Sequence, residues 1–323
     1  MALPRLLITR RLPTTVEQHL DAHFDTTFNP DDTPLDRDQL AQAMRDYDAL
    51  CPTITDRLDA DILGIADARV RIIANFGAGV DHVDLAAARG AGIVVTNTPD
   101  VLTDATAELA ILLMLSAARR AGEGERVLRA GEWSGWTPTN LIGQSIVGKT
   151  LGLVGFGRIA QMTAERARAG FGMKIAYFSR RRISAEIEAK LDARYVPSLE
   201  ALATEADILS LHTPGGAETH HMIDAALLAR MKPGAILVNT ARGTVVDEAA
   251  LAEALATGRI AAAGLDVYEK EPQVHPALLE RDNAVLLPHL GSATIETRVA
   301  MGMRAAANLE SFFDGREPRD RVA

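Results

Sequence analysis

Arg242, Glu271 and His289 are the residues whose types and positions best fit catalysis in this chain. Each stands behind a short apolar segment of the kind that forms a buried strand, and ligands of α/β proteins bind beyond the carboxyl ends of strands. A guanidinium binds a carboxylate through paired hydrogen bonds, an imidazolium donates a proton, and a neighbouring carboxylate favours the charged imidazole. Beside a nicotinamide, these groups would serve the reduction of a 2-keto acid. A lone histidine is more often structural, and the sequence alone does not bring the three together.

A glycine-rich turn predicts where such a cofactor would bind. Leu151–Val154 is expected to form a strand, and Gly155-Phe156-Gly157-Arg158-Ile159-Ala160 follows it with the pattern G-x-G-x-x-A. A helix and a second strand, Met173–Phe178, come next. Gly155 permits the tight turn and Gly157 lets the backbone approach a pyrophosphate, while the helix N-terminus presents unpaired N–H groups to it. This order of elements predicts a dinucleotide site rather than an ordinary turn with two glycines.

The four residues after the second strand, Ser179, Arg180, Arg181 and Arg182, indicate which dinucleotide is preferred. An NAD site usually carries Asp or Glu here, roughly 20 residues past the glycines, to bind the ribose 2′-hydroxyl. This chain has no acid until Glu186. A carboxylate would repel a 2′-phosphate, whereas a hydroxyl and a guanidinium would bind it. We therefore expect Ser179 and Arg180, with Arg181 beside them, to favour NADPH and leave NADH as the weaker cofactor. Arg182 is expected to be a solvated loop residue.

Length and composition indicate a globular protein of two domains. The 323 residues are 47% hydrophobic and 24% charged, as is ordinary for soluble proteins. A net charge of −9 argues against nucleic-acid binding. Cys51 is the only cysteine, which excludes an intrachain disulfide and a cysteine-based metal cluster. The apolar stretch at the N-terminus is too short for a signal peptide. The most apolar run, Leu109–Ala118, is too short to span a membrane. We expect a cytoplasmic enzyme with no membrane partner.

Apolar segments alternate with helical patterns along the chain, which predicts parallel, doubly wound sheets. The expected strands are Leu6–Thr9, Ala49–Cys51, Arg71–Ala74, Ile93–Thr96, Leu151–Val154, Met173–Phe178, Ile208–Leu211, Ala235–Asn239, Ile260–Leu265 and Val285–Leu287. The expected helices are Thr14–His23, Asp59–Ala66, Leu85–Arg89, Thr103–Arg119, one behind the glycine turn, Leu199–Glu205, Ala225–Met231, Glu248–Thr257 and Thr294–Phe313. Helical spacing predicts the more buried positions of two of them, namely Ile159, Met162 and Ala167, and then Ile295, Val299, Met303, Ala306 and Leu309.

Two loops are candidates for contacts with other molecules. Asn75–Val80 follows an expected strand, and backbone N–H groups freed by Gly77 and Gly79 would hold a carboxylate. A plain connection between strand and helix is the alternative. The segment 122–150 is expected to be irregular and contains Trp133 and Trp136. Exposed tryptophans favour contact with another subunit, and a buried satellite cluster is the alternative.

Six stretches resemble, in the same order, the D-isomer-specific 2-hydroxyacid dehydrogenases, and most of all their glyoxylate/hydroxypyruvate reductase branch. They run over nearly the whole chain: Gly77–Asp84 (GAGVDHVD), Asn97–Leu109 (NTPDVLTDATAEL), Gly148–Ala160, Val238–Glu248 (VNTARGTVVDE), Gly264–Pro272 and Pro288–Thr294 (PHLGSAT). The chain departs from the family pattern at two positions. Ala160 replaces the usual third glycine, which is tolerated, and Ser179 replaces the acid of NAD-type sites.

The resemblance implies a fold and an assembly. It implies an α/β protein of two doubly wound parallel-sheet domains, with a Rossmann dinucleotide-binding domain (residues 102–290) inserted in a flavodoxin-like substrate domain (residues 1–101 plus 291–323). It also implies that the loop of Trp133 and Trp136 reaches toward a partner subunit, so that we expect a homodimer.

The resemblance further implies NADPH-dependent reduction of glyoxylate or hydroxypyruvate. It implies that Arg242 binds the substrate carboxylate and that Glu271 orients the acid–base residue His289. Gly79 and Val80 are expected to touch the substrate. The expected cofactor-binding residues are Thr106, Gly155, Gly157, Arg158, Ile159, Ser179, Arg180, Arg181, Thr213, Pro214, Thr240, Asp266 and Gly291.

Other functions are less consistent with the sequence. Phosphoglycerate dehydrogenases often carry a regulatory domain, for which we expect no room after Phe313, and lactate-type relatives usually keep an acid at position 179. A 2-ketogluconate substrate remains an alternative. A dinucleotide-sensing corepressor also remains one, because relatives of this fold with that role can keep all three polar residues. No metal site is expected, since His220-His221 lacks the H-E-x-x-H spacing, and no G-x-S-x-G hydrolase turn occurs.

Overall fold

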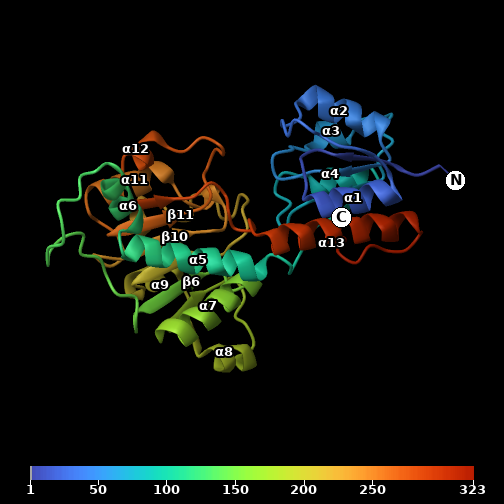
Figure 1. The fold of residues 1–323 in the computed structure, drawn as a ribbon. Coiled ribbons are helices and arrows are strands. Elements are labelled where there is room, and N and C mark those ends of the chain that lie inside the picture. Colours follow the sequence, from blue (N-terminus) through green and yellow to red (C-terminus); the bar gives the residue numbers. More distant parts are fainter. Residues whose placement is uncertain (1) are drawn as a thin grey trace. The chain divides into compact units, whose positions relative to one another are not determined.

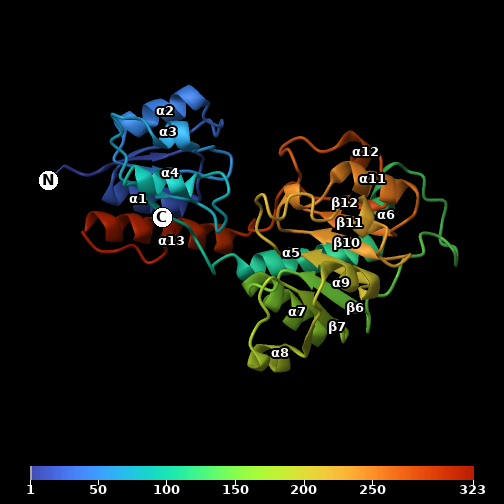
Figure 2. The same ribbon diagram turned by 180° about the vertical axis from the view of Figure 1, so that it is seen from behind.

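The structure, a computed structural model, describes residues 2–323 and divides into two compact units. One unit combines the chain up to Leu102 with Ser292–Ala323, and the other consists of Thr103–Gly291. In Figures 1 and 2 the first unit is therefore drawn in blue and red, and the second runs from green to orange. No helix among residues 2–323 is both long and apolar enough to cross a lipid bilayer.

The first unit is built on a five-stranded parallel sheet in the order β2-β1-β3-β4-β5, which is the flavodoxin-like order. Its strands are β1 (Arg5–Ile8), β2 (Asp25–Thr27), β3 (Ala49–Cys51), β4 (Ile72–Ala74) and β5 (Val94–Thr96). Its helices are α1 (Thr14–His23), α2 (Arg37–Asp46), α3 (Ala60–Leu63), α4 (Leu85–Gly90) and α13 (Ile295–Phe313).

Both faces of this sheet are buried, because successive strand residues point to opposite sides. Leu6 and Ile8 pack in one core with residues of α1 and α13, whereas Leu7 packs in the other with residues of α2, α3 and α4. The red helix α13 lies along α1 in both views (Figures 1 and 2). Burial on both faces explains why the strands read as continuous apolar runs.

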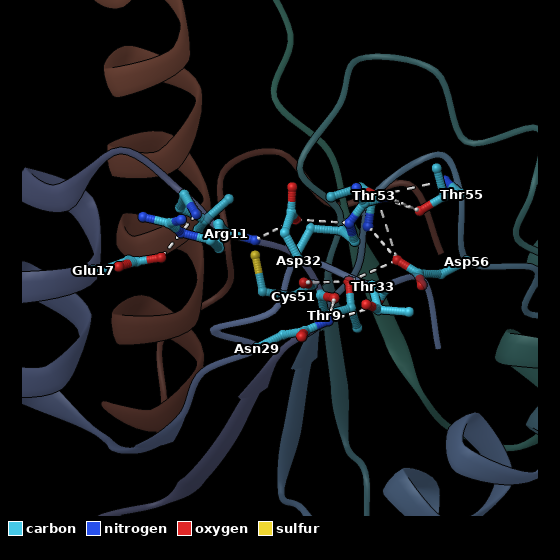
Figure 3. Close-up of polar contacts among 12 residues, drawn as sticks. Thr9, Arg11, Glu17, Asn29, Asp32, Thr33, Cys51, Thr53, Thr55 and Asp56 are labelled. Carbon is cyan, nitrogen blue, oxygen red and sulfur yellow. Dashed lines mark hydrogen bonds and ion pairs between the residues drawn. The ribbon is translucent and has the colours of Figure 1, made fainter. Parts of the chain in front are cut away.

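A buried polar network holds the turn that follows β3. The hydroxyl of Thr9, just past β1, donates to Asp56 Oδ2 at 2.6 Å, and the backbone N–H of Thr53 donates to the same oxygen at 2.8 Å. Figure 3 shows these contacts together with Asp32, which accepts the N–H of Arg11. The carboxylate of Asp56 thereby ties the ends of two adjacent strands together.

The second unit is built on a seven-stranded parallel sheet in the order β12-β11-β10-β9-β6-β7-β8. Its strands are β6 (Thr150–Val154), β7 (Lys174–Phe178), β8 (Ala193–Tyr195), β9 (Ile208–Leu211), β10 (Ile236–Asn239), β11 (Ala262–Leu265) and β12 (Ala284–Leu286). Its helices are α5 (Thr103–Ala118), α6 (Ala121–Arg129), α7 (Arg158–Phe171), α8 (Ala185–Leu191), α9 (Leu199–Glu205), α10 (Ala225–Leu228), the 3₁₀ turn η1 (Gly243–Val245), α11 (Glu248–Ala256) and α12 (Pro276–Leu279).

The strand order of the second unit reverses at β6, which pairs with both β7 and β9. This is the order of a Rossmann sheet, and ligands bind at its switch point beyond the carboxyl ends of the strands. Because all the strand pairs are parallel, those ends lie on one edge. The sheet thus carries along that edge the residues that follow β6, β7, β9, β10, β11 and β12, namely Gly155, Ser179, His212, Thr240, Asp266 and Leu287.

The predicted fold class is confirmed, and most of the predicted elements are present with ends shifted by one to three residues. Two predicted helices are shorter than expected, α3 and α10. Six helices and strands were not predicted from the sequence, β2, α2, α6, α8, β8 and α12, and neither was the 3₁₀ turn η1. Most of these are short or polar; α2 for instance is held by a capping box between Asp36 and Gln39, a local hydrogen-bond device that apolar spacing does not reveal.

Two predictions of buried helix faces are partly wrong. In α7 the fully buried residues are Ala160, Thr163, Ala164 and Ala167, while Ile159 and Met162 are half-buried. In α13, Ile295 is 81% exposed and Met303 is 36% exposed. The buried face of α13 instead runs through Gly302, where an added Cβ would lie 2.5 Å from Cγ1 of Val16 on α1. Small residues define this face because α1 packs directly against the backbone.

Candidate active site

Glu271 and His289 form the centre of the candidate active site in the second unit. Nδ1 of His289 lies 2.8 Å from Glu271 Oε2, and both side chains are 31% exposed. A carboxylate oxygen can only accept, so Nδ1 carries the hydrogen and Nε2 is left to exchange a proton with a ligand. The other carboxylate oxygen of Glu271 accepts the backbone N–H of Tyr268 at 3.0 Å.

The positive charge of Arg242 acts on Glu271 together with that of His289. Burial by itself would raise the pKa of Glu271, yet the net shift is downward. The hydrogen bond and charge of His289 lower it most, followed by the Tyr268 N–H and the positive charge of Arg242. Glu271 is therefore ionised at neutral pH and accepts the Nδ1 hydrogen of His289.

Arg242 is positioned by the turn between β10 and η1. Asn239 donates to the carbonyl oxygen of Arg242 at 2.9 Å and accepts the N–H of Ala241 at 3.0 Å. Gly243 follows, and an added Cβ there would lie 1.8 Å from the carbonyl carbon of Tyr268. Only glycine fits this contact, which brings the backbone beside Arg242 against the segment that carries Glu271.

Asp266 organises the backbone around His289. Its carboxylate accepts the N–H groups of Leu290 at 2.6 Å and Gly291 at 2.8 Å, and its carbonyl accepts the N–H of His289 at 2.9 Å. His289 has a φ of 55°, in the left-handed region where non-glycine residues are held by their surroundings. Burial raises the pKa of Asp266 to about 6, against the lowering effect of these N–H groups and of the charge of His289.

The turn behind β6 has the shape that a pyrophosphate requires. Gly155 has a φ of 82°, and an added Cβ would lie 2.7 Å from the carbonyl oxygen of His212. Gly157 is the N-cap of α7, has no side-chain cap, and has no atom within 4 Å of an added Cβ. The space beside the start of this 14-residue helix is therefore open at Gly157, and a phosphate would be bound there.

Two buried hydroxyls on the same strand edge lack a partner within residues 2–323. They are Oγ1 of Thr213, after β9, and Oγ1 of Thr240, after β10. Buried polar atoms without a partner are uncommon in folded proteins and need an explanation such as a ligand. Together with the uncapped helix, they fit a dinucleotide lying along the strand ends. Thr106 is committed differently, because its hydroxyl donates to the carbonyl oxygen of Gly291 at 3.0 Å.

The residues after β7 lie at the surface with mixed contacts. The hydroxyl of Ser179 donates to the carbonyl oxygen of Arg181 at 2.5 Å. The guanidinium of Arg180 forms an ion pair with Glu218, and both side chains are about three-quarters exposed (74% and 76%). Arg182 binds Glu188 through two hydrogen bonds of 2.8 and 2.7 Å. Arg182 lies exposed in the loop as expected, and it also pairs with Glu188 of helix α8.

The loop Asn75–Val80 in the first unit is more constrained than expected. The N–H of Gly77 donates to the carbonyl of Asn75 at 2.9 Å, so it is not free for a carboxylate as predicted. Nδ2 of Asn75 donates to the carbonyls of Gly77 and Gly79, and its Oδ1 lies 2.9 Å from Nε2 of His82. This arrangement leaves the N–H groups of Gly79 and Val80 without an acceptor within residues 2–323.

Comparison with known proteins identifies the family. Residues 111–291 match the family model described as D-isomer specific 2-hydroxyacid dehydrogenase, NAD binding domain. A glyoxylate reductase of Thermococcus onnurineus is 45% identical over 319 residues, 98% of this chain and 94% of that protein. This chain belongs to the D-isomer-specific 2-hydroxyacid dehydrogenases.

Solved structures of such dehydrogenases share the whole fold. A D-isomer specific 2-hydroxyacid dehydrogenase from Polaromonas sp. JS6 66 superposes with a TM-score of 0.93 at 38% identity, covering 99% of this chain and 100% of that one. An NADPH-dependent glyoxylate/hydroxypyruvate reductase of Sinorhizobium meliloti in complex with NADP and malonate gives 0.87 at 38%, covering 100% and 97%. As a member of this family, the chain is an NAD(P)-dependent dehydrogenase.

Sequence analysis overlooked three residues that shape this dehydrogenase site: Tyr268, Asn239 and Glu218. Tyr268 and Asn239 act through backbone groups and a turn, which no residue pattern predicts. Glu218 lies 38 positions from Arg180 in the sequence. The two residues meet because β7 and β9 end at the same edge of the sheet with only β6 between them. For Asn239, its place inside the motif Val238–Glu248 was the only available signal.

Proposed function

We propose that this chain reduces glyoxylate, and with it hydroxypyruvate, to the 2-hydroxy acid with NADPH as hydride donor. The observation that carries the proposal is the charged cluster of Glu271, His289 and Arg242, which pairs a proton donor with a carboxylate-binding cation. The names of the relatives from T. onnurineus and S. meliloti point to the same substrates.

In the proposed reaction Arg242 holds the carboxylate of the keto acid through paired N–H groups. When bound, the reduced nicotinamide supplies a hydride to the carbonyl carbon. His289 donates the proton on Nε2 to the carbonyl oxygen, because Nδ1 is already committed to Glu271. The substrate becomes an alcohol, and His289 becomes neutral while its Nδ1–H still donates to Glu271. Glu271 stabilises the imidazolium before transfer and fixes the ring orientation throughout.

The remaining site residues are proposed to bind and position. The N–H groups of Gly79 and Val80 in the first unit would donate to the substrate, so we assign that unit as the substrate domain. Asp266 would hold the backbone of His289 and Gly291 beside the nicotinamide. The second unit is then the dinucleotide-binding domain, with Thr106, Gly155, Gly157, Arg158, Ile159, Thr213, Pro214, Thr240 and Gly291 lining the cofactor.

NADPH preference is proposed from the residues after β7. Arg180 and Arg181 offer positive charge and Ser179 offers no carboxylate to repel a 2′-phosphate. Glu218 competes for Arg180, so binding of the phosphate must displace this ion pair. Both side chains are largely exposed, and such surface pairs contribute only about 0–1 kcal/mol. The exchange of Glu218 for a doubly charged phosphate is favourable on that account.

A homodimer is proposed from the loop that follows α6. Trp133 is 54% exposed and Trp136 is 81% exposed, which removes the alternative of a buried cluster. Ile142 and Val147 in the same segment are also more than half exposed, at 62% and 68%. Large apolar side chains gathered on one segment are typical of a protein interface. Light scattering should give a dimer mass for the chain and a monomer mass for the double variant Trp133→Ser and Trp136→Ser.

A panel of 2-keto acids with NADPH and NADH tests the proposed reaction. We expect the highest kcat/KM for glyoxylate or hydroxypyruvate with NADPH, and a modest difference between the two acids, since a pocket discriminates such groups by about 1–3 kcal/mol. Preference for 2-ketogluconate or for the phosphoglycerate couple would contradict the substrate assignment. Tight NADPH binding without turnover of any acid would instead favour a dinucleotide-sensing corepressor.

A further inference from the structure

Two imidazoles and a carboxylate gather in the first unit, outside the proposed site. His19 and His23 belong to α1 and Glu310 belongs to α13. One nitrogen or oxygen from each of the three lies within 4.8 Å of the others. Imidazole and carboxylate are ligand types that divalent transition metals accept together.

The helix geometry places both histidines on one side of α1. They are four positions apart, which puts them one above the other on the same face, and their rings stack with centroids 4.4 Å apart at 28°. Glu310 comes from the opposite end of the chain, 291 positions from His19. The close contact of Gly302 with Val16 brings α13 near α1. The side chain of Glu310 on α13 can therefore reach the two histidines on α1.

The hydrogen bond of His23 prepares this ring to act as a ligand. Its Nδ1 lies 2.8 Å from the backbone carbonyl of His19, and a carbonyl can only accept, so Nδ1 carries the hydrogen. Nε2 of the neutral ring then has a free lone pair. Metal-binding histidines almost always donate their second nitrogen to a carbonyl or carboxylate in this manner, which fixes the tautomer.

His19 and Glu310 are hydrogen-bonded to each other at the place where a cation would bind. Nε2 of His19 lies 2.6 Å from Glu310 Oε1, a contact too short to hold a metal between the two atoms. Ligands at about 2.0–2.1 Å from a tetrahedral Zn²⁺ lie about 3.3 Å apart, so small rotations must open this pair and draw His23 closer. The side chains of His19 and Glu310 are 29% and 32% exposed, and His23 is exposed, which leaves room for such rotations.

We propose that His19, His23 and Glu310 bind one divalent transition-metal ion, Zn²⁺ or Ni²⁺, with water in the remaining position. When the ion binds, the hydrogen on Nε2 of His19 is replaced by a hydrogen on Nδ1, so that the neutral ring presents Nε2 and the carboxylate presents Oε1 to the ion. Mg²⁺ and Ca²⁺ are excluded as occupants because they require oxygen ligands. The bound ion clamps the first helix of the chain to the last, so it stabilises the folded first unit. This inference is independent of the proposed reaction.

Calorimetric titration of the untagged full-length chain with ZnCl₂ and with NiCl₂ tests the proposal. We expect one equivalent to bind, with a rise in the melting temperature. His23→Ala removes an exposed ligand and should weaken binding at least about tenfold while leaving glyoxylate reduction unchanged. Glu310→Gln keeps the size of the side chain and should also weaken binding. Substitution by Co²⁺ should give visible absorption bands of a low-coordinate nitrogen and oxygen site, which His23→Ala abolishes.

A second cluster provides the matched control. His220 and His221, in the loop after β9, and Glu269, in the loop after β11, also bring ligand atoms within 4.8 Å of one another in the second unit. The double variant His220→Ala and His221→Ala should keep the full equivalent of bound metal. Binding that survives His23→Ala, or that disappears in this control, would overturn the assignment, as would the absence of any binding at micromolar Zn²⁺. If the unmodified chain showed no reductase activity, the proposed function would fail, but these metal-binding outcomes would not change.

Discussion

Glu271 accepts the Nδ1 hydrogen of His289 at 2.8 Å while its second oxygen accepts the N–H of Tyr268 at 3.0 Å. Each oxygen of the carboxylate therefore accepts a hydrogen bond, and the carboxylate cannot rotate without losing one of them. This fixes the direction of the imidazole ring, so Nε2 is the atom through which His289 can exchange a proton.

His289→Ala should lower kcat by about 10²–10⁴, because the proton donor to the carbonyl oxygen is lost. NADPH affinity, measured by fluorescence titration, should stay near that of the unmodified chain. Glu271→Gln should lower kcat less, since the ring remains but its charged form is no longer stabilised. The exposed His220→Ala is the control and should keep full activity. Near-normal turnover of His289→Ala would remove this residue from the mechanism.

Arg242→Lys should lower kcat/KM for glyoxylate about 10- to 100-fold, as expected when one charge-assisted hydrogen bond is lost. Lysine keeps the charge but presents a point donor in place of the planar fork. The melting temperature should change little. Arg126→Lys, at a surface ion pair with Asp282, serves as the matched control with unchanged kinetics. Equal kinetics for Arg242→Lys and the unmodified chain would make Arg242 a structural residue.

Ser179→Asp combined with Arg180→Ala should move the cofactor preference toward NADH. The carboxylate repels a 2′-phosphate and accepts from a free 2′-hydroxyl, while loss of Arg180 removes a contact of about 1.5–3 kcal/mol. Arg181 is adjacent and reduces the effect. The measurement is kcat/KM for both cofactors. A chain that prefers NADH before substitution, or an unchanged preference afterwards, would show that these residues do not recognise the ribose.

Glu218→Gln offers the opposite test of the same site. This substitution releases Arg180 from its ion pair, so KM for NADPH should fall while KM for NADH stays constant. Glu205→Gln, which breaks the ion pair with Arg194 on the same unit, should change neither value. An equal change for both cofactors would place Glu218 outside phosphate recognition.

Asp266 should give the reductase an acid limb near pH 6. Burial raises the pKa of Asp266 to about 6, so the carboxyl takes up a proton below that pH. A protonated carboxyl cannot accept both the Leu290 and Gly291 N–H groups, and the backbone beside His289 loosens.

The pH dependence of kcat for glyoxylate reduction checks this assignment. In Asp266→Asn the limb near pH 6 should vanish, with a lower rate at every pH because the NH₂ that replaces one carboxylate oxygen cannot accept its N–H group. Asp224→Asn, at the N-cap of α10, is the matched control and should keep the limb. A limb that persists in Asp266→Asn would assign it to another group.

The local sequence determined the secondary structure wherever a strand was fully buried and bounded by turns. Ile208–Leu211 and Leu199–Glu205 have the predicted bounds because apolar spacing and a capping Ser198 act within a few residues. The glycine turn was equally readable, since Gly155 is required by its own φ of 82° and by the approach of His212. The types and order of Arg242, Glu271 and His289 were enough to predict a site, because each follows a strand.

Tertiary structure alone decided the contacts between distant segments. The partner of Arg180 is Glu218, which the strand order β7-β6-β9 places beside it. The buried face of α13 is set by its contact with Val16, so spacing within the helix predicted Met303 where Gly302 is buried. His19 and His23 meet Glu310 only after both chain ends fold into one unit. Interactions between such distant segments depend on how the elements pack together, and the spacing of residues along the sequence does not describe that packing.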